Sequence, residues 1–252
     1  MQIRPGVDLA GITDVGSVRE NNEDHYAYWE PARDEDFRRL GRLLIVADGM
    51  GGHEGGQEAS HIAVESVQES YAGGKDGDPR SWLLNSFEVA HQRIQQFAAA
   101  HPLLYGMGTT CTAVVILDHS LFYAHVGDSR LYLVREGYLY RLSRDHSYVG
   151  RLVEQGIISP EEANAHPQRN ILTAALGSGA RPEPESPEQP IPLENGDLLM
   201  LCTDGLWSLL TDDEILRALA APSLNEACER LVQQAKDRGG LDNVTVQIAR
   251  LQ

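Results

Sequence analysis

Two uninterrupted apolar runs constrain the fold of this chain more than any other feature of its sequence. Residues 43–49 read LLIVADG, and residues 198–205 read LLMLCTDG. A strand-length run with no polar alternation is typically buried on both faces, so other layers must cover it on both sides. Each run ends in an aspartate followed by glycine, Asp48 and Asp204, which places a carboxylate where a buried strand ends.

The order of the other segments indicates packed antiparallel sheets rather than a parallel sheet. Helical spacing of apolar residues predicts two long helices over 58–71 and 80–101. Four strand-like segments separated by turn residues follow between residues 109 and 145, as in an antiparallel meander. Strands therefore mostly neighbour strands in the sequence, which favours sheets packed face to face with helices outside.

The remaining segments complete a tally of roughly ten strands and five helices. Strands are expected at 7–14, 24–29 and 243–251, short helices at 147–156 and 159–166, and two helices with a proline break within 211–240. Residues 181–192 contain five prolines and are expected to form an extended surface connector or a sheet edge.

Composition narrows the class of partner. The formal net charge is −16 and the pI is near 4.9. Nucleic-acid-binding proteins usually present a basic patch, and none is visible in this sequence, so a nucleic acid is not expected as a partner. An anionic partner would be repelled except at a local positive centre, which a bound cation would supply.

The lack of a visible targeting signal and the wide spacing of the cysteines favour a cytoplasmic protein with no membrane partner. The first residues lack an apolar core of signal-peptide length, and the longest apolar runs are shorter than the roughly 20 residues of a membrane helix. Cys111, Cys202 and Cys228 are far apart in the sequence and are expected to be small buried thiols in a reducing compartment.

Acidic residues recur at the ends of predicted strands. They are Glu23 and Asp24 in NNEDHY, Asp48, Asp204, and Asp242 before the last strand. If these strands are neighbours, the carboxylates meet at one rim, where their repulsion would force some of them to take up protons. A divalent cation removes this conflict, and oxygen-only ligation suits Mg²⁺ or Mn²⁺ better than Zn²⁺.

The glycine-rich sequence beside Asp48 is consistent with a metal site, but it is also typical of an ordinary turn. Gly49, Gly51 and Gly52 would let the backbone approach an ion or a phosphate, and two bridged metals can activate water for in-line displacement at phosphorus. Each Asp-Gly pair alone is also a turn signal, and GDSR at 127–130 also reads as a hairpin loop. The ordered recurrence of these pieces along the chain is what favours the metal site.

That ordered set resembles the PPM family, the metal-dependent type 2C Ser/Thr protein phosphatases, with the spacing of the bacterial branch. The resemblance runs from about Gly11 to Gln247 and rests on seven ordered motifs: TDVGSVRENNEDHY, VADGMGGHEGG, MGTTCTAVVI, AHVGDSRLYLVREGYLYRLSRDHS, ILTAALGS, CTDGLWSLL and DNVTVQI. It implies an α+β fold, a four-layer α-β-β-α sandwich of two antiparallel sheets flanked by helices, with metals in a cleft at one end. It also implies a single catalytic domain over 1–252, with a flap subdomain at about 147–175 beside the cleft.

The resemblance implies a ligand set for two Mn²⁺ or Mg²⁺ ions. Asp48 would bridge both ions, and the Gly49 carbonyl would bind one of them. Asp204 and Asp242 would complete the other site. Asp128, in GDSR, would be a ligand of a third, weaker metal.

The first motif and its neighbours carry the other implied roles. Glu23 and Asp24 match the family's Glu-Asp pair, and Asp24 is favoured as the member that acts directly or through metal-bound water. Arg19 matches the phosphate-binding arginine, whose planar fork suits a phosphoryl group. Met50 stands where animal members carry a histidine proposed as general acid, and a thioether cannot donate a proton. His53 could substitute, or it could be an ordinary loop histidine.

Ser208 marks a second departure from the animal pattern. Animal members place an acidic ligand of the third metal at this position, so the resemblance implies that a third metal would be bound weakly. Asp128 and water could still maintain the site.

The function implied is hydrolysis of phosphoserine and phosphothreonine on proteins by a metal-bridged hydroxide, in opposition to a Ser/Thr kinase and its targets. Two alternatives stay open, a non-catalytic regulatory module of the same fold and a phosphatase of small molecules. A pseudo-enzyme would be expected to lack at least one of Asp48, Asp204 and Asp242, and all three are present.

Overall fold

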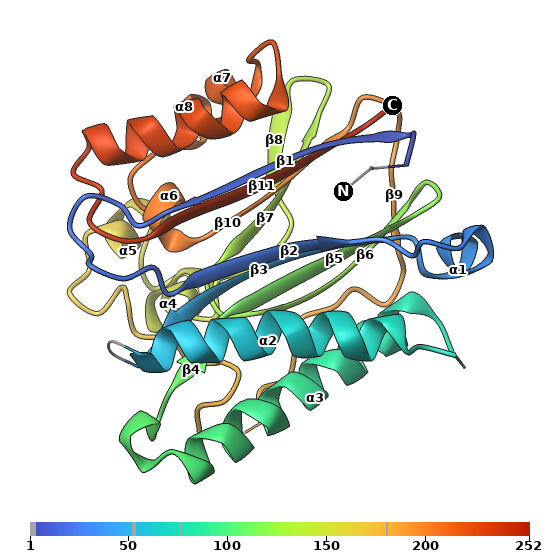
Figure 1. The fold of residues 1–252 in the computed structure, drawn as a ribbon. Coiled ribbons are helices and arrows are strands. Elements are labelled where there is room, and N and C mark those ends of the chain that lie inside the picture. Colours follow the sequence, from blue (N-terminus) through green and yellow to red (C-terminus); the bar gives the residue numbers. More distant parts are fainter. Residues whose placement is uncertain (1–3, 52–53, 76, 180) are drawn as a thin grey trace.

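The computed structural model describes residues 4–51, 54–75, 77–179 and 181–252. Two antiparallel sheets pack face to face in this part of the chain (Figure 1). The first sheet has the order β1-β11-β10-β7-β8, with β1 (Val7–Asp14), β7 (Arg130–Arg135), β8 (Tyr138–Arg141), β10 (Leu198–Cys202) and β11 (Val244–Leu251). The second has the order β2-β3-β5-β6-β9, with β4 paired to β3; its strands are β2 (Asp24–Trp29), β3 (Arg42–Met50), β4 (Gly108–Thr109), β5 (Cys111–Leu117), β6 (Ser120–Val126) and β9 (Ile191–Pro192).

Long helices cover both outer faces of the pair of sheets. The second sheet is covered by α2 (Glu54–Ala72) and α3 (Pro79–Ala100), and the first by α7 (Asp212–Leu219) and α8 (Leu224–Asp237) (Figure 1). The shorter elements are α1 (Asp34–Leu40), the 3-10 turn η1 (Pro102–Leu104), α4 (Tyr148–Glu154), α5 (Pro160–Asn164) and α6 (Asp204–Trp207). The α-β-β-α sandwich expected from the sequence is confirmed.

The two apolar runs form central strands that contribute to two core layers each. Leu43, Ile45 and Ala47 of β3 face α2 and α3, whereas Leu44 and Val46 face the layer between the sheets. In β10, Leu198, Met200 and Cys202 face α7 and α8, and the alternate residues Leu199 and Leu201 join the same central layer. Each fully buried aliphatic side chain stabilises the fold by roughly 1.5–3 kcal/mol. These two strands are therefore rigid supports for the aspartates at their ends.

The predicted four-stranded meander is wrong at its centre. The chain forms two hairpins, β5 with β6 and β7 with β8, but β6 and β7 belong to different sheets. Glu136 and Gly137 both adopt positive φ, as a two-residue hairpin turn requires. In the segment 127–129 only Gly127 has positive φ, and a Cβ there would lie 2.5 Å from Thr110. This segment crosses from one sheet to the other instead of closing a hairpin.

Other expected elements are present with their predicted character. The first turn of α5 carries a capping box between Ser159 and Glu162. The proline-rich segment runs along the edge of the second sheet, where Glu185 pairs with His125 and β9 pairs with β6. The three cysteines are buried free thiols. None of the helices in the described residues is long and apolar enough to cross a membrane. Helices α1 and α6 were not predicted.

Candidate active site

Five aspartates converge where strands of both sheets end. Asp24 opens β2 and stands directly opposite Asp48 of β3 in the antiparallel ladder. Asp204 opens α6 just after β10, and Asp242 precedes β11. These strand ends meet at one end of the sandwich, on the left in Figure 1. Asp128 lies near them, on the crossover between the sheets. Its charge acts on Asp48 together with the charges of Asp24, Asp204 and Asp242. We call these five residues the aspartate cluster.

Burial and mutual repulsion raise the pKa values of four members of the cluster. Loss of hydration raises the pKa of Asp24 to about 7, and the charges of Asp204 and Asp242 add to the effect. Burial likewise raises the pKa of Asp204 to about 6, with Asp242 as the main charged neighbour. The pKa values of Asp48 and Asp128 lie well above the ordinary carboxyl range for the same two reasons. The bare cluster would hold protons at neutral pH.

The chemistry of this cluster fits a divalent cation that prefers oxygen ligands. The converging donors are carboxylates, which are the ligands that Mg²⁺ and Mn²⁺ favour. A bound cation would replace the protons and relieve the repulsion among buried charges. The residues present therefore fit the metal that the sequence resemblance implies.

Two threonine hydroxyls fix the Asp24 carboxylate. Thr203 Oγ1 and Thr245 Oγ1 donate to Asp24 Oδ2 over 2.8 and 2.7 Å. Both threonines belong to the opposite sheet or its loop, so these bonds also join the two sheets. They lower the pKa of Asp24 against the effect of burial. Sequence reasoning missed them, although Thr203 directly precedes Asp204 and interrupts an apolar run.

Asn243 ties the loop that carries Arg19 to the start of β11. Its side-chain amide donates to the carbonyls of Val15 and Asn21 over 3.0 and 2.9 Å. Its Oδ1 accepts the backbone N–H of Glu23 over 2.8 Å. This residue was also missed, because a single asparagine beside an aspartate gives no sequence signal.

Arg19 lies at the exposed edge of the cluster. Its Nη2 is 2.8 Å from Asp242 Oδ2, and this hydrogen bond is the main reason that its pKa is raised. The charges of Glu23 and Asp48 act in the same direction. About half of the arginine side chain is exposed, so a guanidinium group is available beside the buried carboxylates.

Glu23 and Asp24 are adjacent in sequence but lie in different surroundings. A Cβ added to Gly56 would lie 2.4 Å from Glu23 Oε2, so this carboxylate packs against the first turns of α2. The Asp24 carboxylate instead faces Asp204 and Asp242. The charge of Glu23 also acts on Arg19, so the preference for Asp24 as the acidic residue of the first motif that acts at the site stays a prediction.

The glycines that follow Asp48 and Asp204 allow a close approach between backbone segments. A Cβ on Gly49 would lie 2.0 Å from the carbonyl oxygen of Gly56, and one on Gly205 would lie 2.0 Å from that of Asn243. Such distances are impossible for any other residue type without rearrangement. Packing is therefore a second reason for these glycines, beside the access to an ion that the sequence suggested. Gly52 lies outside the described residues.

Backbone and hydroxyl hydrogen bonds join Asp48 to the crossover. Asp48 N–H donates to Thr110 Oγ1 over 2.9 Å, and Thr110 N–H donates back to the Asp48 carbonyl over 2.9 Å. Thr109 Oγ1 donates to the same carbonyl, and Thr110 Oγ1 lies 2.8 Å from Ser129 Oγ. Thr110 thus holds both Asp48 and Ser129, the residue that follows Asp128.

A stacked tryptophan holds the backbone of Asp128. Trp207 Nε1 donates to the Asp128 carbonyl over 2.9 Å. The guanidinium carbon of Arg130 lies 3.5 Å from the Trp207 ring centroid, and this arginine forms two hydrogen bonds with Asp145 over 2.7 and 3.0 Å. Ion pair and stack are largely buried, so this arrangement fixes the crossover.

Met50 and Ser208, the two departures from the animal pattern, both lie within the described residues. Met50 ends β3 and pairs with Gly108 of β4. His53, the possible general acid, lies outside the described residues, so its role stays a prediction. Ser208 directly follows α6 as its C-cap.

A second group with metal-ligand chemistry comprises His125, His146 and Glu185, whose ligand atoms all lie within 4.8 Å of one another. His125 Nδ1 lies 2.8 Å from Thr112 Oγ1, and its Nε2 lies 3.0 Å from the carbonyl of Gly127. Burial lowers the pKa of His125 to about 3, which keeps it neutral. With both nitrogens hydrogen-bonded, His125 has no free lone pair for a metal.

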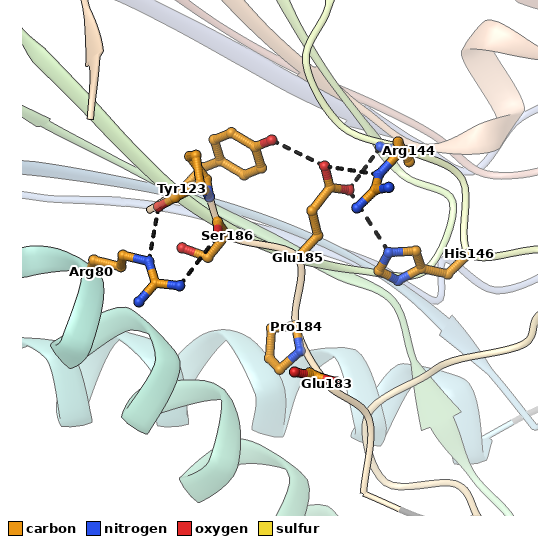
Figure 2. A pocket seen from close by; sticks show the side chains of 9 residues that line it. Arg80, Tyr123, Arg144, His146, Glu183, Pro184, Glu185 and Ser186 are labelled. Atoms are coloured by element: carbon orange, nitrogen blue, oxygen red, sulfur yellow. Dashed lines mark hydrogen bonds and ion pairs between the residues drawn. The ribbon is translucent and has the colours of Figure 1, made fainter. Parts of the chain in front are cut away.

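Glu185 is equally occupied. It accepts from Tyr123 Oη and from the backbone N–H of Arg144, and lies 3.4 Å from Arg144 Nε (Figure 2). These residues line an open pocket of about 450 Å³. The saturated hydrogen bonding favours a structural role for this group rather than a metal site.

Comparison with known proteins assigns the family. The model of the protein phosphatase 2C family matches residues 19–239. Protein phosphatase PhpP of Streptococcus pneumoniae is 36% identical over 250 residues, which cover 97% of this chain and 98% of that protein. The chain belongs to the protein phosphatase 2C family.

Solved structures agree with this assignment. The serine/threonine phosphatase of S. agalactiae is 35% identical with a TM-score of 0.88, covering 98% of this chain and 100% of that one. The catalytic domain of serine threonine protein phosphatase PstP, in complex with two manganese ions, is 35% identical with a TM-score of 0.83, covering 98% of each chain. The family, the fold and the enzyme class expected from the sequence, a protein-serine/threonine phosphatase, are confirmed, and the manganese complex supports metal dependence.

Proposed function

We propose that this chain removes phosphate from phosphoserine and phosphothreonine on proteins and thereby opposes a Ser/Thr kinase. The observation that carries the proposal is the aspartate cluster with Arg19 at its exposed edge. Buried carboxylates supply sites for cations, and the guanidinium group supplies the matching contact for a phosphoryl group. The non-catalytic alternative is not favoured, because no member of this set is missing.

Two ions of Mn²⁺ or Mg²⁺ would be held by residues of both sheets. Asp48 would be shared between them, with the Gly49 carbonyl on one side and Asp204 and Asp242 on the other. Asp24 would act directly or through water, and Asp128 would serve a third, weaker ion. When bound, such ions supply Lewis-acid activation of water and of the phosphoryl oxygens.

The side chains of this chain have separable tasks. Arg19 would exchange its bond with Asp242 for one with the incoming phosphate and so orient the substrate. Thr203 and Thr245 would keep the Asp24 carboxylate aimed at the site. His53 remains the candidate proton donor to the leaving hydroxyl group.

The proposal also covers the domain organisation of the chain and its place in the cell. The chain would form one catalytic domain over 1–252, with residues 147–175, which contain α4 and α5, as a flap that tunes substrate access. We infer a bacterial signalling enzyme of the cytoplasm from the family spacing and from the bacterial relatives.

The direct test is a phosphatase assay with p-nitrophenyl phosphate and a phosphothreonine peptide, with and without Mn²⁺. EDTA should abolish turnover, and Mn²⁺ or Mg²⁺ should restore it. Asp48→Asn should lower kcat by several orders of magnitude, roughly 10³-fold or more, while the fold survives. The matched control is Asp118→Asn in the exposed β5–β6 turn, whose φ of 52° asparagine accepts readily. Wild-type turnover in Asp48→Asn would contradict the proposal.

A further inference from the structure

Two exposed aliphatic side chains flank the arginine of the candidate site. Val18 precedes Arg19, and Leu241 precedes Asp242, the ion-pair partner of that arginine. Their relative exposures are 61% and 59%. Single exposed aliphatic residues are common and need no explanation. Here, however, one occurs on each of the two loops that meet at the edge of the aspartate cluster.

The two loops are bound to each other on both sides of these residues. Ser17 N–H donates to the Gly240 carbonyl over 2.8 Å, and Arg19 pairs with Asp242 over 2.8 Å. Val18 therefore lies between Ser17 and Arg19 on one loop, and Leu241 lies between Gly240 and Asp242 on the other. The two aliphatic residues therefore occupy corresponding places in one joint between the loops.

Close packing makes this joint rigid. Gly16 has a φ of 80°, and a Cβ there would lie 2.2 Å from the Asp242 carbonyl oxygen. Gly240 has a φ of 49°, and a Cβ there would lie 2.7 Å from Ser17 Oγ. Lys236 Nζ pairs with Asp14 at the base of the same joint, 3.0 Å from Oδ2. Aliphatic groups on such a support can bind without first losing much conformational entropy.

From this juxtaposition we infer that Val18 and Leu241 form a specificity rim that contacts an apolar residue next to the phosphorylated residue of a protein substrate. The inference rests on the proposed phosphatase function. The occupant follows from charge complementarity and reach: Arg19 takes the phosphate, and each neighbouring residue of an extended peptide lies about 3.5 Å further along the chain. Burying aliphatic surface on both partners favours an apolar neighbour over a polar one of equal charge.

The test compares two phosphothreonine peptides that differ only in leucine or glutamine on both sides of the phosphothreonine. These residues have similar size and no charge, so apolar contact is the variable. In the wild-type protein with Mn²⁺, kcat/KM should be roughly three- to tenfold higher for the leucine peptide. In Leu241→Gln, and separately in the nearly isosteric Val18→Thr, this ratio should fall toward one.

Leu103→Gln is the matched control, because Leu103 is fully exposed on η1, away from the joint. It should keep the wild-type ratio. A ratio near one in the wild-type protein would overturn the inference but leave the phosphatase function intact. A ratio preserved in both rim variants, or lost equally in Leu103→Gln, would also overturn it. A change of oligomeric state in the rim variants would assign the rim to a second copy of the chain instead. Absence of turnover of both peptides and of p-nitrophenyl phosphate would remove the proposed function itself, and the inference with it.

Discussion

Thr245→Val is the substitution that isolates one support of the candidate metal site. The valine side chain has nearly the shape of threonine but cannot donate to Asp24 Oδ2, which the hydroxyl approaches to 2.7 Å. Its other partner is Thr13 Oγ1 at 2.7 Å, and because Thr13 is exposed, its hydroxyl can turn to solvent. Thr203 is a less clean target, because its oxygen also accepts the buried N–H of Thr245.

The expected size of the effect follows from the charge on the acceptor. A hydrogen bond to an ionised group contributes roughly 1.5–3 kcal/mol, and one pKa unit corresponds to about 1.4 kcal/mol. Losing the bond should therefore raise the pKa of Asp24, already about 7, by about one unit or more. A metal ligand must be deprotonated, so Mn²⁺ affinity at pH 7 should fall about tenfold. The acid limb of the pH–activity profile should move to higher pH.

Calorimetric titration with Mn²⁺ between pH 6 and 8.5 measures the affinity, and a phosphatase assay over the same pH range measures the acid limb of the activity profile. Thr112→Val is the matched control, since that buried threonine bonds to His125 and not to an aspartate. It should reduce thermal stability while leaving Mn²⁺ affinity near the wild-type value. Unchanged Mn²⁺ affinity in Thr245→Val across this pH range would refute the argument that the threonine hydroxyls tune the Asp24 carboxylate.

Three further predictions address the remaining parts of the site. Arg19→Ala should raise KM for phosphopeptides by roughly 10–100-fold with a smaller change in kcat, and an unchanged KM would exclude the arginine from phosphate binding. Folding raises the pKa of Asp24 from 3.8 to about 7, so the proton is bound more tightly in the folded state. The melting temperature of metal-free protein should therefore fall as pH rises from 4 to 7, by an equivalent of roughly 4 kcal/mol for this residue, whereas Mn²⁺-saturated protein should lack that decline. A metal-free protein that gains stability over this range would contradict the repulsion described here. Trp207→Phe removes the donor to the Asp128 carbonyl and should weaken the weakest Mn²⁺ site in a calorimetric titration; identical titrations would show that the stack has no such role.

Hydrophobic patterning was enough to place the central strands and the layers. The run LLIVA of β3 has no polar residue, which predicts a strand covered on both faces. Its residues do alternate between two core layers. The same pattern places Asp48 and Asp204 near the ends of these strands, although β3 continues two residues past Asp48 to Met50, where it pairs with β4.

Features that depend on tertiary contacts were not accessible in the same way. Whether GDSR closes a hairpin or crosses between sheets depends on packing of Gly127 against Thr110, which are 17 residues apart in the sequence. Thr245 is 221 residues from Asp24, so neither residue alone indicates their hydrogen bond. Helix α6 begins at Asp204 itself and spans only four residues, too few to show helical periodicity.

Anomalous diffraction from crystals grown with Mn²⁺ tests the central claim most directly. Peaks are expected among Asp24, Asp48, Asp204 and Asp242, with Asp48 contacting more than one ion. Manganese bound only at His125, His146 and Glu185, or carboxylates of the cluster too far apart to share an ion, would contradict the account.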